Sequence, residues 1–420
     1  MVRRSLLASA IVSTTSLFAA RLPPQTAVLR GGALRLSSVA STDNPLLKFD
    51  GLPRFDVIDA THVKPGVSET LATLEEKFAE LEKTLSEKET PSYSDVVEAM
   101  EQLEDPVEYT WGVVGHLMGV KNSDELRAVH GEMQGEVIKT TTKMSQSAAV
   151  FKALEIVAKD SSLDAAQVRI VEASLKGMRL SGVALEGEDK ETFNKNRIEL
   201  SELSTTFSNQ LLDATKAFSL TLTDKAEVEG LPPSALALAA SRAVEDGKEG
   251  ATPESGPWKL GLDMPSYLPS MKFLKSRAVR EQLYRAMVTR AGEENSPLIT
   301  RILQIKEEQA KILGFTTYAE VSLERKMAES VEAVDELTEM LLAKAMPAAK
   351  KELAGLTAFA TERGFSESEL ALWDVPFWSE RQSEALFEFE EEELRPYFAL
   401  PNVLDGLFVL TNRFAPPYLA

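Results

Sequence analysis

The chain has 420 residues, with 46 Lys and Arg against 65 Asp and Glu, three His and no Cys, and its formal net charge is −19. A sequence without Cys excludes disulfide frameworks, thiolate nucleophiles and Cys-ligated zinc or iron–sulfur sites. The negative charge argues against a nucleic-acid-binding protein, because contacts with phosphates need a basic face.

The first 42 residues predict a disordered organelle targeting segment. They contain five Arg, many Ser and Thr, and no Asp, Glu or Lys, which is typical of a transit peptide. A secretory signal peptide, a bipartite leader and an untargeted disordered tail are the alternatives. The apolar stretch at residues 6–20 is interrupted by Ser and Thr, and it is shorter than the roughly 20 apolar residues of a membrane helix.

Without this segment, 41 basic residues face 65 acidic ones and the formal charge is −24. No later stretch has the apolar length of a membrane span. We therefore expect a soluble mature protein in the plastid stroma or the mitochondrial matrix, with no nucleic acid and no membrane among its partners.

Long amphipathic helices are predicted after residue 43. Ser123 or Asp124 is a plausible N-cap for one of them. Apolar residues recur at intervals of mostly three or four from Phe193 to Phe218 and from Val331 to Phe359, which is the period of one helix face. We interpret both stripes as core-facing, and we expect Pro347 to kink the second helix.

Extended segments are few. Residues 218–223 alternate apolar and polar side chains, and residues 258–262 precede a turn at Pro265 and Pro269, so we expect a short strand in each. Three Gly and two Pro at residues 244–257 indicate an exposed loop between them. The fold class predicted is mainly α with a few short strands, and no doubly wound sheet.

No familiar catalytic motif occurs in the sequence. It contains no G-x-G-x-x-G, no Walker A motif, no G-x-S-x-G and no H-E-x-x-H. The zinc motif needs two His one helical turn apart, whereas His62, His116 and His130 are far apart in sequence. His62 lies where a helix should begin, His116 on an apolar helix face and His130 on a polar helix. We therefore interpret all three His as structural residues.

A series of short motifs nevertheless follows the order found in one protein family. The motifs are Asn44-Pro45-Leu46-Leu47, His116-Leu117, Val120-Lys121-Asn122-Ser123, Leu212-Asp213-Ala214-Thr215, Asp263 with Pro265-Ser266-Tyr267-Leu268-Pro269, Arg280 with Tyr284-Arg285-Ala286, Lys326-Met327-Ala328, Trp373-Asp374 and Leu394-Arg395-Pro396-Tyr397-Phe398. With them, residues 44–414 resemble the oligopeptidase A type of the thimet oligopeptidase family of zinc metallopeptidases.

The resemblance implies a two-lobed, largely helical zincin-type architecture around a deep channel that admits short peptides. Residues 43–270 would form the helical N-terminal lobe, and residues 271–420 the opening helical part of an incomplete catalytic domain. In the family, a zinc-bound water attacks the peptide carbonyl and the Glu of H-E-x-x-H is the general base. No catalytic residue or metal ligand of that set can be transferred to this sequence, and the substrate-binding residues are unknown.

The expected protein is thus a monomeric zinc endopeptidase of short peptides, such as cleaved targeting peptides, present here as an inactive N-terminal fragment. In such a fragment, the apolar stripe from Val331 to Phe359 would be exposed. Two alternatives stay open. One is a non-catalytic helical module that binds peptides or regulates, and the other is a dipeptidyl carboxypeptidase of the same family.

Overall fold

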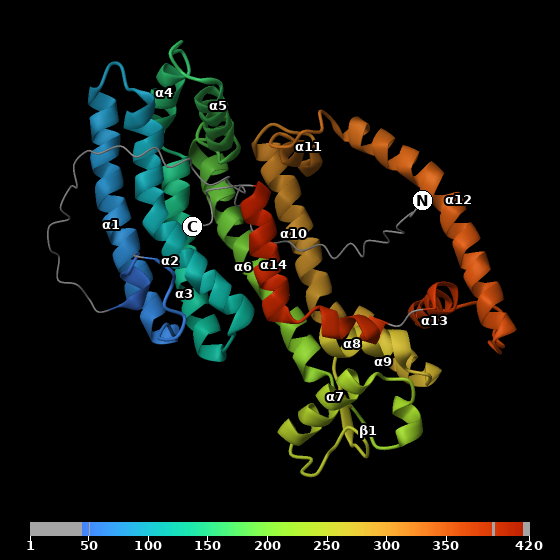
Figure 1. Ribbon diagram of the computed structural model, residues 1–420. Coiled ribbons are helices and arrows are strands. Elements are labelled where there is room, and N and C mark those ends of the chain that lie inside the picture. The colour runs from blue at the N-terminus through green and yellow to red at the C-terminus, as the bar shows by residue number, and fades with distance from the viewer. Residues whose placement is uncertain (1–43, 50, 389–390, 415–420) are drawn as a thin grey trace. The chain divides into compact units, whose positions relative to one another are not determined.

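The computed structural model describes residues 44–49, 51–388 and 391–414 (Figure 1). The predicted targeting segment lies outside the described residues. The described part is mainly helical, as the sequence predicts, and it has two short strands. None of its helices is both long and apolar enough to cross a membrane.

The first apolar core lies among five helices. The short 3₁₀ turn η1 (Pro45–Leu47) precedes the first of them, and the π turn η2 (Ser94–Glu98) lies between the first and the second. The helices are α1 (Ala60–Glu87), α2 (Ala99–Val120), α3 (Asp124–Ser145), α4 (Ala148–Val157) and α5 (Ala165–Leu180). Four of them start at a side-chain cap, in which Asp59, Ser123, Ser147 or Asp164 accepts a backbone N–H of the first turn. The Ser123 cap confirms the predicted start of α3. These caps satisfy backbone donors that have no partner within a helix.

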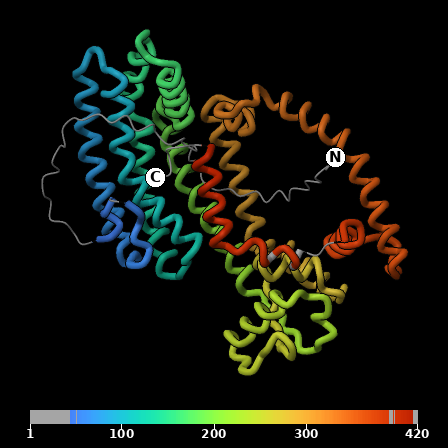
Figure 2. Tube along the Cα trace, viewed as in Figure 1, coloured from blue at the N-terminus to red at the C-terminus, as the bar shows by residue number. Residues whose placement is uncertain are grey.

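The long helix α6 (Gly187–Ala217) connects this core to the rest of the chain and packs against both α3 and α10 (Gly292–Ile312). Figure 2 shows α6 and α10 as neighbouring tubes. An ion pair between Arg127 and Asp213, at 2.6 Å, joins α3 and α6. A second ion pair, between Arg301 and Glu199 at 2.6 Å, joins α10 and α6. The predicted apolar stripe of α6 is confirmed as a packing face, although most of it is half-buried.

A second apolar core surrounds a two-stranded antiparallel sheet. Strand β1 (Leu220–Leu222) pairs with β2 (Trp258–Leu260), with Leu220 opposite Leu260. The other elements of this part are η3 (Lys225–Val228), α7 (Pro233–Glu245), α8 (Met264–Phe273) and α9 (Arg277–Thr289). Both predicted strands are confirmed, and the segment between α7 and β2 is the predicted loop.

The remaining elements are α11 (Tyr318–Leu323), α12 (Val331–Glu362), α13 (Val375–Phe387), the 3₁₀ helix η4 (Glu391–Tyr397) and α14 (Leu400–Phe414). Helix α12 runs without a break through Pro347. The prediction that its apolar stripe faces the core is wrong, because only Leu356 and Ala360 of the helix are buried. The alternative expectation, an exposed stripe, is confirmed for most of the helix.

Candidate functional site

The three His lie apart, each with a local partner. His62 occupies the third position of α1 and its Nδ1 accepts the backbone N–H of Asp59, which completes a capping box. The ring of His116 lies 5.1 Å from the ring of Phe55 and is exposed. The prediction that His116 sits on the apolar face of its helix is therefore wrong. The next residue, Leu117, is the one that lies on the buried face.

His130 is buried and stacks on Trp111 with a centroid distance of 4.7 Å. Its Nδ1 is buried without a hydrogen-bond partner in the described structure. Burial lowers the pKa of this imidazole, because the charged form loses its hydration. His130 is thus a neutral packing residue, and the structural interpretation of the three His is confirmed for His62 and His130.

The described residues do not fit the zinc that the resemblance implies. They contain no group of three or more His, Cys, Asp or Glu that could hold a metal ion, whereas a catalytic zinc takes three protein ligands. No zinc-dependent step is assigned to these residues.

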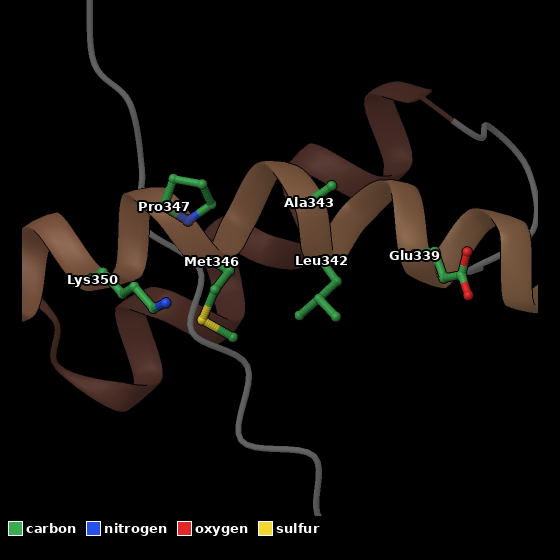
Figure 3. A pocket seen from close by; sticks show the side chains of 6 residues that line it. All are labelled: Glu339, Leu342, Ala343, Met346, Pro347 and Lys350. Atoms are coloured by element: carbon green, nitrogen blue, oxygen red, sulfur yellow. The ribbon is translucent and has the colours of Figure 1, made fainter.

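One hollow on the described surface is formed by a single helix (Figure 3). Its lining residues are Glu339, Leu342, Ala343, Met346, Pro347 and Lys350, all on α12. One helix cannot enclose a small molecule, and ligand pockets usually bury most of their ligand's surface. The hollow is therefore a shallow part of the exposed α12 surface and not a small-molecule pocket.

That surface is apolar over several turns. Leu337, Leu341 and Leu353 of α12 are each about half exposed. Such a run of large apolar side chains is unusual on a soluble monomer and is typical of a surface that contacts other protein. Helix α14 presents a second apolar surface, in which Leu407 and Phe408 are about half exposed.

A buried ion cluster holds α13 in place, and the last turns of α12 pack against α13. Asp374, which immediately precedes α13, is completely buried and accepts hydrogen bonds from Arg277 and Arg280 of α9 at 3.0–3.1 Å. Its carboxylate also accepts the backbone N–H of Ala371 at 3.1 Å. Arg280 in turn donates to the carbonyl oxygens of Leu274 and Trp373.

The two guanidinium groups differ in their surroundings. Burial lowers the pKa of Arg280, and the Asp374 carboxylate offsets only part of that effect. Hydrogen bonding to Asp374 raises the pKa of the more exposed Arg277. The rings of Trp373 and Phe377 lie beside these cations, with Arg280 4.3 Å from the Phe377 centroid and Arg277 5.5 Å from the Trp373 centroid.

Arg280 and Trp373-Asp374 belong to the family motifs in the sequence, and the motifs alone indicate no role for them. The structure assigns them one, which is to attach α13 to α8 and α9. The signal in the sequence was an Asp next to a Trp inside an otherwise apolar segment, where a solvated charge is unexpected.

Comparisons with known proteins cover both cores. Residues 67–190 match the model of the neurolysin/thimet oligopeptidase N-terminal domain, and residues 270–414 match that of peptidase family M3. The chain is 44% identical over 384 residues to the organellar oligopeptidase A, chloroplastic/mitochondrial, of Arabidopsis thaliana, and 44% identical over 378 residues to a probable cytosolic oligopeptidase A of the same plant. These alignments cover 90% and 88% of the chain, and 48% and 53% of the two relatives.

A dipeptidyl carboxypeptidase of Escherichia coli (strain K12) is 27% identical over 387 residues, which cover 89% of the chain and 55% of that relative. The chain therefore spans about half the length of the curated relatives it matches, and it is more similar to the two oligopeptidases than to this carboxypeptidase.

Proposed function

The chain belongs to the thimet oligopeptidase family, peptidase family M3, and we propose that it is the helical part of an oligopeptidase A-type peptidase that degrades short peptides. The observation that carries this proposal is the 44% identity to oligopeptidases over 90% of the chain. The lower identity of 27% to the dipeptidyl carboxypeptidase favours endopeptidase chemistry over removal of terminal dipeptides.

The contribution of these residues is to shape and hold the peptide-binding space. The resemblance implies helical lobes that form a channel, and the exposed apolar surface of α12 supports a role in contacting other protein segments. The cluster around Asp374 keeps α13 against α8 and α9, and α13 in turn packs on the last turns of α12. These contacts position the surface and take no part in bond cleavage.

Hydrolysis itself is not expected from these 420 residues alone. Their sequence contains no H-E-x-x-H, and the described part has no cluster that could hold a metal. Zinc would supply the activated water in the family's reaction. A non-catalytic, peptide-binding form is the second candidate function, and the same two observations favour it.

The proposed location is an organelle, with the mature protein acting as a monomer. The Arg-rich, acid-free composition of residues 1–42 supports import into a plastid or mitochondrion, and the name of one relative includes both organelles. The cytosolic relative at equal identity is the reason to test import directly, by following a fluorescent protein fused after residue 42.

A peptidase assay tests the inactivity and the peptide binding that both candidate functions predict for this chain. The purified chain is mixed with an internally quenched peptide, with and without zinc and a chelator, and the Arabidopsis organellar relative serves as positive control. We expect no turnover, together with saturable binding of the peptide measured by fluorescence anisotropy. Turnover that the chelator abolishes would contradict the expected inactivity, and absence of binding would contradict both candidate functions.

A further inference from the structure

Two arginines on neighbouring elements have no carboxylate partner in the described structure. They are Arg197 on α6 and Arg325, which follows α11. By contrast, Arg301 on the neighbouring helix α10 is paired with Glu199 on α6. In a chain with 65 acidic and 46 basic residues, two adjacent cations without a carboxylate are unexpected.

Arg197 lies where the ends of two helices meet the beginning of α6. Gln146, the residue after α3, donates to the carbonyl oxygen of Ser181 at 2.8 Å and to Oδ1 of Asn194 at 2.7 Å. Ser181 is the residue after α5. The Nη1 atom of Arg197 lies 3.5 Å from Oγ of Ser145, the last residue of α3. The Arg197 guanidinium is therefore at the carboxyl end of α3, with the end of α5 beside it.

Arg325 lies against the last turns of α5. A Cβ atom built on Gly177 of α5 would lie 2.8 Å from Nη2 of Arg325, so this guanidinium packs on the bare backbone one turn before Ser181. The segment is fixed there by Lys176, which donates to the carbonyl oxygen of Glu324 at 2.8 Å and pairs with its carboxylate at 3.1 Å.

The charges at this junction do not balance. Burial lowers the pKa of Arg197, and the positive charge of Arg325 lowers it further, which agrees with two guanidinium groups close together. The carboxyl ends of α3 and α5 each supply roughly half a negative charge, against two full positive charges. Lys176 and Glu324 neutralise each other. Among these groups, positive charge therefore exceeds negative charge at the junction.

A hydroxyl group without a partner lies in the last turn of α3. Oγ1 of Thr142 is buried and has no hydrogen bond in the described structure. Thr142 precedes Ser145 by three residues and Gln146 by four, so the three side chains share one face of α3. Since the side chains of Ser145 and Gln146 contact α6, the Thr142 hydroxyl is on the side of α3 that faces Arg197.

We propose that Arg197 and Arg325 form a binding site for an oxyanion, either a phosphate or the terminal carboxylate of a peptide. The planar guanidinium group suits such ligands, because its N–H groups match two oxygen atoms at once. The hydroxyl of Thr142, which has no partner in the described structure, can supply a further donor, whereas that of Ser145 already donates to the carbonyl oxygen of Thr142. The site does not depend on peptidase activity, since none of its residues belongs to the family's catalytic motif.

The test uses the full chain and a substitution at the exposed arginine, Arg325→Met, with Arg54→Met as matched control. Arg54 is also an exposed arginine, and it pairs only with Asp56. Inorganic phosphate is titrated at constant ionic strength by calorimetry, and a second arm compares a hexapeptide that has a free carboxyl terminus with its amidated form. Circular dichroism verifies that each variant is folded.

We expect saturable binding whose Kd rises about tenfold or more in Arg325→Met, because charge-assisted hydrogen bonds are lost, and stays unchanged in Arg54→Met. Binding of phosphate alone identifies a small-anion site, and binding of the free but not the amidated peptide identifies a peptide carboxylate. Absence of saturable binding in both arms would overturn the proposal, as would equal binding by the two variants. In anion-free buffer, Arg325→Met should melt no lower than the unaltered chain, since it removes a repulsion. A lower melting temperature would overturn the charge surplus on which the site depends.

Discussion

Replacement of Asp374 by Ala tests the role of the buried ion cluster. The substitution removes a carboxylate with no exposed surface and leaves Arg280, only 2% exposed, without its charged partner. Arg277 would lose the same partner, but 37% of its side chain is exposed and water can replace the bond. The cost should therefore come mainly from Arg280.

The expected loss is about 3–5 kcal/mol, which is the usual cost of removing one partner from a buried ion pair. A matched control is Asp213→Ala, which removes the carboxylate from the 2.6 Å contact with Arg127. Because 53% of the Asp213 side chain is exposed, its removal should cost about 1 kcal/mol or less. Asp374→Asn should fall between the two, because it keeps the side-chain volume and an acceptor for the N–H of Ala371.

The assay is hydrogen exchange of peptides that cover α13, combined with urea unfolding followed by tryptophan fluorescence. Local exchange is needed because a chain with two apolar cores is not expected to unfold in one step. Trp373 and Trp378 border the cluster and report on it directly. If Asp374→Ala accelerated exchange in α13 no more than Asp213→Ala does, the cluster would not be what attaches α13.

Three further outcomes follow from single contacts. His130→Phe should keep the stacking on Trp111 and reduce the fall in melting temperature between pH 8 and pH 5.5. Burial lowers the pKa of His130, so its neutral ring favours the folded state above about pH 6.5, and this contribution is lost as the pH falls below that value. An unchanged dependence of the melting temperature on pH would contradict this prediction. Leu342→Glu on the exposed α12 surface should change the free energy of unfolding by less than about 0.5 kcal/mol and lower the binding of a hydrophobic dye. The control Leu356→Glu, at a residue of the same helix that is only 5% exposed, should destabilise the chain by several kcal/mol. Ser123→Ala should cost about 1 kcal/mol in thermal unfolding, because its Oγ accepts the Leu126 N–H at the start of α3.

Local pattern was sufficient to predict the helical class, two of the long helices and both short strands. The 3.6-residue period identified α6 and α12, alternation identified β1, and the following turn indicated β2, because each depends only on side chains a few residues apart. The Ser123 cap was predictable for the same reason. What covers a helix face depends on residues far away in sequence, and so the exposure of Leu337 and Leu341 could not follow from their spacing.

The candidate site was less accessible to sequence reasoning. Asp374 lies 94 residues from Arg280, and charged side chains are solvated far more often than buried, so nothing local marks this pair. His116 illustrates the opposite error, in which apolar neighbours suggested burial although its own position on α2 points outward. The placement of Arg197 beside Arg325 likewise depends on how α6 and the segment after α11 meet.

The exposed surface of α12 belongs to a helix that contacts both α11 and α13. Ser330 only completes its first turn by accepting the N–H of Ala333, whereas the buried Leu356 and Ala360 attach its last turns to the part that Asp374 secures. Exposure of the middle therefore does not result from a detached helix. Since Leu342 and Asp374 lie on different elements and share no partner in the described structure, the effects of Leu342→Glu and Asp374→Ala on unfolding free energy should add to within about 0.5 kcal/mol. A double variant that departs from the sum by more than this would show that the middle of α12 is packed in solution, and it would contradict the exposed surface.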